Sequence, residues 1–390
     1  MDNAMSREIL AQAKRIVVKV GSRVLVQRSG RPDIRRMAAL VRDLAAVREL
    51  GREVVLVSSG AIACGMEAMG LRRRPEDLPT LQMAAAVGQN RLMALYDRLF
   101  AEAHCRIGQV LLTHADLENR RRHLNAKHCL RKLLEHGAVP VVNENDAVST
   151  DEIKFGDNDA LASRTAMLLQ ADLLVLLTTV DGFRVPGADG RERVVSCLPC
   201  VDEEALSHTA GKGSPLSTGG MASKLGAAAE AAQTGTHVVI ANGRKSGTLP
   251  KILSGRPVGT WLPAGAPNEL NLRRRWVMFF HRPPRGTLTV DDGARDAIVR
   301  DGKSLLAVGV RSVEGTFAPG DLVEVRDLRG APVARGLAAY SHIAAIAFMG
   351  LKTSEIHAKF GAGIPDEIIH HDNLVLDPAA LRGATPNPGT

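Results

Sequence analysis

The sequence lacks any long apolar run. No stretch of its 390 residues reaches the ~18 apolar residues that a membrane-spanning helix requires, and no basic segment followed by a long apolar one opens the chain. We therefore expect a cytoplasmic protein that does not contact a membrane.

Cysteine is also scarce. Five cysteines at uneven spacing are too few for a disulfide framework, and "CLPC", Cys197 to Cys200, lacks the second pair that a zinc site needs. We expect reduced thiols without a catalytic role and name no metal-ligating residue.

The common phosphate-binding fingerprints are missing too. The chain has no G-x-x-x-x-G-K-[ST] and no G-x-G-x-x-G after its first predicted strand, which disfavours the common NTPase and dinucleotide-binding classes. It offers instead short glycine turns, "SSGAIACG" and "STGGMASK", whose backbone N–H groups can point at phosphate oxygens.

The bulk composition is that of a folded protein. At 45% hydrophobic and 24% charged residues, the chain is long enough for two domains. The net charge of +8 comes mostly from arginine, in scattered runs at 72–74, 120–122 and 273–275. Scattered runs are more typical of a solvated surface than of a nucleic-acid patch, and the positive field also suits a small anionic substrate.

Short β-branched segments alternate with helical patterns in the first two thirds of the chain. After "RIVVKVG" comes a helical pattern with Pro32 near its start and Ile34, Met37, Val41 and Leu44 on one face. Further strands are predicted at "EVVLVSS", "IGQVLLT", "AVPVVN", "DLLVLLTT" and "THVVIAN". Apolar strands joined by helices predict an α/β fold with a largely parallel sheet covered by helices on both faces.

This pattern ends near "PAGAPNELNLRRRW", whose Pro, Gly and Asn indicate a boundary. Beyond it, short strand patterns such as "GTLTVDDGA" and "APVARGLAAYS" predict a compact β-rich module with Gly and Pro turns. We assign residues 1–272 to the α/β domain, 273–282 to a linker, 283–363 to the module and 364–390 to a tail.

Ligands of a parallel sheet bind beyond the carboxyl ends of its strands, and polar side chains gather there. Lys19 ends the first strand, in an apolar run where a charge must be paired or functional. Lys224 lies in the first turns of the helix that "STGG" opens, so two ammonium groups can converge on one crevice. Two lysines and glycine turns are suited to neutralising a phosphoryl group in transfer.

Acidic side chains are crowded near the same strand exits. Asp157, Asn158 and Asp159 exceed what a helix cap needs, and Asp146 lies in the preceding stretch "NENDAVST". A carboxylate acceptor is ionised at neutral pH, so the lack of an obvious histidine base does not count against phosphoryl transfer. The alternative remains open that Lys19 snorkels and that the acids only cap helices.

The stretches "VVKVGSRVL", "SSGAIACG", "QMAAAVGQ", "NENDAVST", "IKFGDND" and "TGGMASK" occur in this order as in the glutamate 5-kinases of the amino-acid kinase family. The chain resembles that family from about Ala13 to Leu376. The resemblance implies an amino-acid kinase-like domain followed by a small PUA-like barrel domain. It also implies ATP-dependent phosphorylation of the side-chain carboxylate of L-glutamate, the first step of proline synthesis, with Mg²⁺.

The resemblance implies roles for individual residues as well. Lys19, Lys224 and Asp159 would be catalytic, with Asp159 holding the two lysines in place. The glutamate contacts would be Ser59, Asp146 and Asn158. The ATP contacts would be Lys19, Thr178, Thr179, Thr218, Gly219, Gly220, Met221, Ala222, Ser223 and Lys224. Thr179, where relatives often have aspartate, and Ser217, where glycine is common, depart from the pattern on the nucleotide side.

The resemblance also bears on partners. It implies feedback inhibition by proline, a homo-oligomer, and hand-over of the labile product to a glutamate-5-semialdehyde dehydrogenase. A second hypothesis is an RNA-associated protein acting through the PUA-like module. Residues 283–363 hold ten Lys plus Arg and nine Asp plus Glu, which is not the basic face that RNA binding favours.

Overall fold

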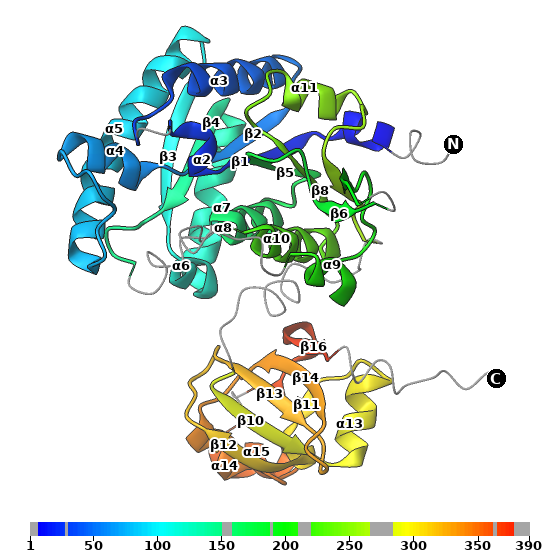
Figure 1. Cartoon of the computed structure of the whole chain (residues 1–390). Coiled ribbons are helices and arrows are strands. Elements are labelled where there is room, and N and C mark those ends of the chain that lie inside the picture. Colours follow the sequence, from blue (N-terminus) through cyan, green and yellow to red (C-terminus); the bar gives the residue numbers. More distant parts are fainter. Residues whose placement is uncertain are drawn as a thin grey trace. The chain divides into compact units, whose positions relative to one another are not determined.

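The computed structural model describes residues 7–27, 30–149, 158–187, 190–209, 220–265, 284–361 and 365–377. The chain divides into two compact units, Met1–Asn268 and Glu269–Thr390 (Figure 1). The predicted linker at 273–282 lies outside the described residues.

A seven-stranded sheet forms the centre of the described part of the first unit, in the order β3-β4-β2-β1-β5-β8-β9. All neighbouring strands pair in parallel except β8 and β9, which are antiparallel. The strands are β1 (Arg15–Val20), β2 (Glu53–Val57), β3 (Arg106–Leu112), β4 (Ala138–Glu144), β5 (Leu173–Thr178), β8 (His237–Asn242) and β9 (Thr260–Leu262). This pairing confirms the predicted α/β class with a largely parallel sheet. The physical reason is that the central strands carry apolar side chains on both faces and must be covered on both.

Helices cover both faces of this sheet (Figure 1). One layer contains α3 (Ile34–Glu49), α5 (Leu78–Glu102) and α11 (Thr248–Leu253), and the other contains α7 (Arg120–Glu135), α8 (Asn158–Leu169) and α10 (Met221–Gln233). The remaining helices of this unit are α2 (Ser22–Leu25), α4 (Ala61–Ala68), α6 (His114–Glu118) and α9 (Glu203–Ser207), and a hairpin joins β6 (Arg184–Pro186) to β7 (Glu192–Val194). The predicted apolar face of α3 is buried at Met37, Val41 and Leu44, but Ile34 is 49% exposed because it is the first helical residue.

Helices α4 and α5 pack through two glycines. A Cβ on Gly65 would lie 1.7 Å from the carbonyl oxygen of Ala84, and a Cβ on Gly88 would lie 1.7 Å from that of Ala61. The two backbones therefore approach more closely than any side chain permits. This close packing fixes where the N-terminus of α4 lies.

The start of the described chain is held by a buried arginine. Arg7 is 1% exposed, and its guanidinium donates hydrogen bonds to the carbonyl oxygens of Ser196, Arg256, Val258 and Gly259 at 2.5, 3.3, 2.9 and 3.1 Å. These carbonyls lie beside and just before β9. The 3₁₀ turn η1 (Glu8–Gln12) that follows Arg7 is thereby fixed against the turn that leads into β9.

The second unit has its own apolar core and a five-stranded sheet in the order β12-β10-β13-β14-β16. Its strands are β10 (Gly286–Val290), β11 (Leu305–Leu306), β12 (Val310–Gly315), β13 (Leu322–Arg326), β14 (Pro332–Leu337), β15 (Glu367–Ile369) and β16 (Leu374–Leu376), with β11 pairing with β15. Neighbours pair antiparallel except β10 and β13, which are parallel.

Two sequence-based expectations for this unit need correction. The predicted tail from 364 contains β15 and β16, whose apolar residues pair with β11 and β14, so the fold continues to at least 377. The stretch "DDGA" begins a helix instead of ending a strand, because the Asp291 side chain caps α13 (Asp292–Val299). Two more helices, α14 (His342–Phe348) and α15 (Thr353–Phe360), complete the described fold.

Among the described residues, no helix is both long enough and apolar enough to cross a bilayer. All five cysteines are free thiols, as expected.

Candidate active site

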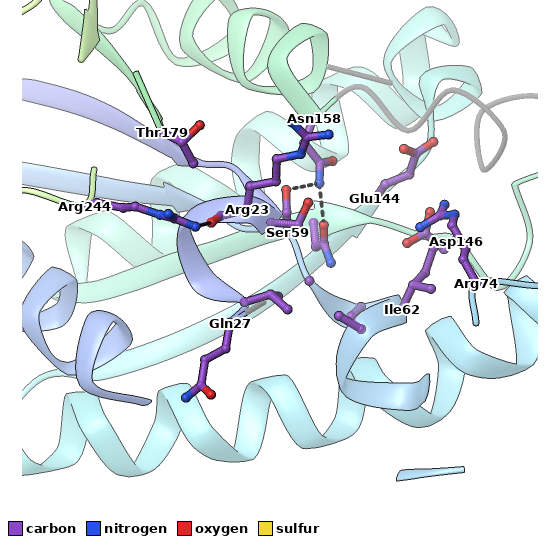
Figure 2. Close-up of a pocket in the computed structure, with 16 residues that line it drawn as sticks. Arg23, Gln27, Ser59, Ile62, Arg74, Glu144, Asp146, Asn158, Thr179 and Arg244 are labelled. Atoms are coloured by element: carbon purple, nitrogen blue, oxygen red, sulfur yellow. Dashed lines mark hydrogen bonds between the residues drawn. The ribbon is translucent and has the colours of Figure 1, made fainter. Parts of the chain in front are cut away.

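A cavity of about 490 Å³ opens at the carboxyl ends of the parallel strands, where the sequence predicted the chemistry (Figure 2). Its wall comes from the segments that follow β1, β2, β4, β5 and β8, together with the start of α8. The lining residues are Ser22, Arg23, Val26, Gln27, Ser59, Gly60, Ala61, Ile62, Ala63, Arg74, Asn143, Glu144, Asp146, Asn158, Thr179 and Arg244. All three residues predicted for the substrate side, Ser59, Asp146 and Asn158, are among them.

The side-chain amide of Asn158 ties three walls of the cavity together. Its Nδ2 donates to the carbonyl oxygen of Ser58 at 2.8 Å, to Ser59 Oγ at 2.9 Å and to Asn143 Oδ1 at 3.0 Å. Figure 2 shows these contacts converging between the exits of β2 and β4. Asn158 is the first residue of α8, so the helix start is fixed to the strand ends it faces.

The next residue of α8 joins the two predicted lysines. Lys19 Nζ lies 2.5 Å from Asp159 Oδ1, and Lys224 Nζ lies 2.8 Å from Asp159 Oδ2. Lys19 comes from β1 and Lys224 from α10, and they are 5% and 6% exposed while Asp159 is fully buried. The two ammonium groups thus converge on one carboxylate, as the resemblance to the glutamate 5-kinases implied.

The two lysines favour the ionised form of the Asp159 carboxylate. Burial alone would raise the pKa of Asp159, but Lys19 and Lys224 outweigh it and lower the pKa below its ordinary value. One carboxylate and two ammonium groups leave a net positive charge at the strand exits. Such a charge suits an anion more than a cation.

Of the residues predicted to contact ATP, the structure describes Lys19, Thr178, Thr179 and those from Gly220 to Lys224. Thr178 ends β5 beside Asn242 of β8, and Thr179 lines the cavity. Gly220 is the N-cap of α10 and, as a glycine, has no side chain that could cap the start of this helix. Thr218 and Gly219 lie outside the described residues, as do Asp157 and Ser217.

The structure adds residues that the sequence did not single out. Asn143 and Glu144 lie within the quoted stretch "NENDAVST", and both are at least 95% buried against the cavity. Glu144 accepts a hydrogen bond from Ser149 Oγ at 3.2 Å. The available signal was that these two polar residues stand at the carboxyl end of a predicted strand, where Asn143 is its last residue and Glu144 follows it.

Cationic side chains and a helix end also line the cavity. Figure 2 shows Arg74, from the segment between α4 and α5, pointing toward Asp146, while Arg23 and Arg244 lie across the opening. The first turn of α4 faces the cavity, and its N-cap, Gly60, gives no side-chain cap. Uncapped N–H groups and arginines favour carboxylate binding. Nothing in the spacing of these arginines marked them in the sequence.

A second, smaller cavity of about 250 Å³ adjoins the first and shares Ala61, Glu144 and Asp146 with it. Amide side chains from α5 and β3, including Gln89 and Gln109, line it. Gln89 also contacts Asn143, because it accepts a hydrogen bond from Asn143 Nδ2 at 2.8 Å.

Comparison with known proteins agrees with this geometry. Residues 14–242 match the amino acid kinase family and residues 286–360 match the PUA domain. A glutamate 5-kinase of Syntrophotalea carbinolica is 44% identical over 375 residues, covering 95% of this chain and all of that protein. A glutamate 5-kinase of Myxococcus xanthus is 46% identical over 373 residues, covering 95% of this chain and 98% of that protein. The chain therefore belongs to the amino acid kinase family and, within it, to the glutamate 5-kinases.

Proposed function

We propose that the protein transfers the γ-phosphoryl group of ATP to the side-chain carboxylate of L-glutamate. A carboxylate oxygen attacks the γ-phosphorus, the bond to the β,γ-bridging oxygen breaks, and the products are ADP and glutamyl 5-phosphate. This reaction opens proline synthesis. The acyl phosphate is labile, which favours hand-over to a glutamate-5-semialdehyde dehydrogenase.

The observation that carries the proposal is the order of residues at the start of α8. Asn158 lines the amino-acid cavity, and the adjacent Asp159 holds the two buried ammonium groups. A glutamate held at Asn158 can therefore extend its side-chain carboxylate toward the charges that would neutralise a transferring phosphoryl group. Lys19 and Lys224 act by position and charge, and Asp159 holds them in place.

The cavity complements the other charges of glutamate. Asp146 can accept hydrogen bonds from the substrate ammonium, while Ser59 and the uncapped first turn of α4 offer donors to a carboxylate. No general base is required, because the acceptor carboxylate is already ionised at neutral pH.

The nucleotide would lie beyond β5 and β8. Thr178, Thr179 and the segment from Thr218 through Gly219, Gly220, Met221, Ala222 and Ser223 to Lys224 are its proposed contacts, because the N-terminal end of a helix such as α10 favours phosphate groups. Mg²⁺ fits as an ion carried by ATP phosphates and water, since both Asp159 oxygens already bind ammonium groups. Its chemistry would be to neutralise phosphate charge.

A hydroxamate assay tests the reaction. The protein is incubated with ATP, Mg²⁺, hydroxylamine and either glutamate, N-acetylglutamate or aspartate. We expect hydroxamate with glutamate above the other two acceptors. Folded protein that forms none with glutamate, or that forms more with another acceptor, contradicts the proposal. A Lys224→Met variant is the matched inactive control.

We also propose that proline competes for the same cavity, because a small amino acid offers an ammonium to Asp146 and a carboxylate to the α4 turn. Excess proline should then raise the apparent KM for glutamate without changing kcat. Rates at low glutamate that do not respond to proline would contradict this.

A further inference from the structure

We propose that Gln89 of α5 is a positioning residue for glutamate, acting through Asn143 on Asn158. This inference rests on the proposed function, because it concerns the same cavity. It assigns a role to a helix that contributes no residue to the wall of the larger cavity. The role is to hold Asn143, and through it Asn158, in place by accepting a buried hydrogen bond.

The chain of amides is continuous and buried. Asn143 Nδ2 donates to Gln89 Oε1 at 2.8 Å, and Asn158 Nδ2 donates to Asn143 Oδ1 at 3.0 Å. Gln89 is 9% exposed and Asn143 is 2% exposed. A lost partner at such depth leaves an amide group without a hydrogen bond, at a cost well above that of a surface contact.

The carbonyl oxygen of Ser58, at one end of the chain of amides, determines which side of each amide group is the donor and which the acceptor. The carbonyl oxygen of Ser58 can only accept, so the Asn158 group that faces it must be the NH₂ group. Asn143 must then present its oxygen to Asn158 and its NH₂ group to Gln89. Gln89 meets that NH₂ group with an oxygen, and a side chain without an acceptor there would leave the buried NH₂ group of Asn143 without this partner and would hold Asn143 less firmly.

This arrangement of hydrogen bonds leaves the side-chain oxygen of Asn158 as an acceptor for a ligand in the cavity. Because the NH₂ group of Asn158 is used by three oxygens, its Oδ1 is left over, and this buried oxygen has no protein partner within the described part of the chain. Asn158 lines the amino-acid cavity. An N–H donor of the ligand, such as the ammonium group of glutamate, is the complement of that oxygen.

Helix α5 is well placed for this role. Gln82, two turns before Gln89 on the same helix, donates to the carbonyl oxygen of Ser149 at 3.2 Å. Gln89 therefore contacts the end of β4, and Gln82 contacts the segment that follows β4 and carries Asp146. The helix holds this part of the chain at two points.

Gln89→Leu tests the proposal in the full-length protein. It keeps the approximate volume but removes the acceptor, so we expect a KM for glutamate raised about tenfold. The KM for ATP and kcat should change little, and the melting temperature should fall by only a few degrees, because the buried NH₂ group of Asn143 loses one partner. Calorimetric titration with glutamate should show the same loss of affinity. An unchanged glutamate KM, or an equal rise in the KM for ATP, would overturn the role of Gln89.

Three further variants separate positioning from general damage. Gln89→Glu keeps an oxygen toward Asn143 and should restore most of the affinity. Gln109→Leu makes the same change on β3, at an exposed residue of the smaller cavity outside the amide chain, and should leave the KM for glutamate unchanged. If Gln89→Leu does not fold, Gln89→Met replaces it in every measurement.

A double variant provides the sharpest outcome. Asn143→Ala already breaks the chain, so adding Gln89→Leu to it should change the KM for glutamate less than twofold. Full additivity of the two effects would show that Gln89 acts by another route. If the wild-type protein binds glutamate but forms no hydroxamate, the proposed reaction fails while the binding titrations still test Gln89.

Discussion

At the scale of single residues, Asp159 is the centre of the site because it compensates two buried positive charges at once. Lys19 and Lys224 each contact a different oxygen of its carboxylate. Removing the carboxylate charge leaves two ammonium groups with no such compensation, whereas removing one lysine leaves an intact pair. The members of the triad are therefore not equivalent for stability.

This asymmetry predicts the order of two variants. Asp159→Asn should lower the free energy of unfolding by about 3–5 kcal/mol, and Lys224→Met by clearly less, since the pair between Lys19 and Asp159 remains. Both should lower kcat more than 100-fold, because both disturb the charges at the phosphoryl group. Urea unfolding and steady-state kinetics measure the two effects. Equal destabilisation would contradict the description of a shared carboxylate.

The same carboxylate predicts a pH dependence. Its pKa in the folded protein lies below the ordinary value of 3.8, so its contribution to stability is full above that value and is lost as the pH falls through the lower folded pKa. The stability gap between wild type and Asp159→Asn should be constant from pH 8 to 5 and narrow below about pH 4. Urea unfolding of both proteins across this range measures the gap. If the stability difference between wild type and Asp159→Asn did not decrease below pH 4, the conclusion that folding lowers the pKa of Asp159 would be contradicted.

At the scale of secondary structure, the contact between α4 and α5 positions the cavity. Gly88→Ala would place a methyl group against the backbone of Ala61, the first residue of α4, whose first turn lines the cavity. We expect a loss of stability of about 1–3 kcal/mol and a higher KM for glutamate.

Gly226→Ala is the matched control for Gly88→Ala. Gly226 lies on the exposed face of α10, where an added Cβ meets nothing within 4 Å. This change should leave the KM for glutamate unaltered and stabilise the protein by about 0.5–1 kcal/mol. Thermal unfolding and kinetics of both variants check the pair. If the two variants changed stability and the KM for glutamate equally, the close contact between α4 and α5 would not be what positions the cavity.

The sequence predicted the elements and the strand exits because both depend on local patterns. A lysine inside an apolar strand marked Lys19, and surplus acids at a helix start marked Asp159. No role was predicted for Gln89, although it ends the quoted stretch "QMAAAVGQ". A glutamine on a long helix is ordinary, and its partner Asn143 is 54 residues away in the sequence. Ile34 shares the predicted apolar face of α3 but is exposed, since periodicity alone does not show which first-turn residue lies at the surface.

At the scale of the whole molecule, the two units have separate apolar cores, and the proposed ligands belong to the first alone. Calorimetry of the full chain should therefore show two transitions. Glutamate at about 100 times its Kd should raise one of them by roughly 5–10 °C and leave the other in place. Asp146→Asn should abolish that shift. Two transitions that move together would contradict independent units.

The arginine at position 7 has a practical consequence for anyone who shortens this protein. A version that begins after it would remove the guanidinium group that four carbonyl oxygens share and would loosen the turn that leads into β9, the antiparallel strand at the edge of the sheet. β9 is an edge strand of the sheet, and an edge strand that is no longer held in place can pair with strands of other chains and cause aggregation. Purification tags are therefore better added ahead of the intact N-terminal segment than in its place.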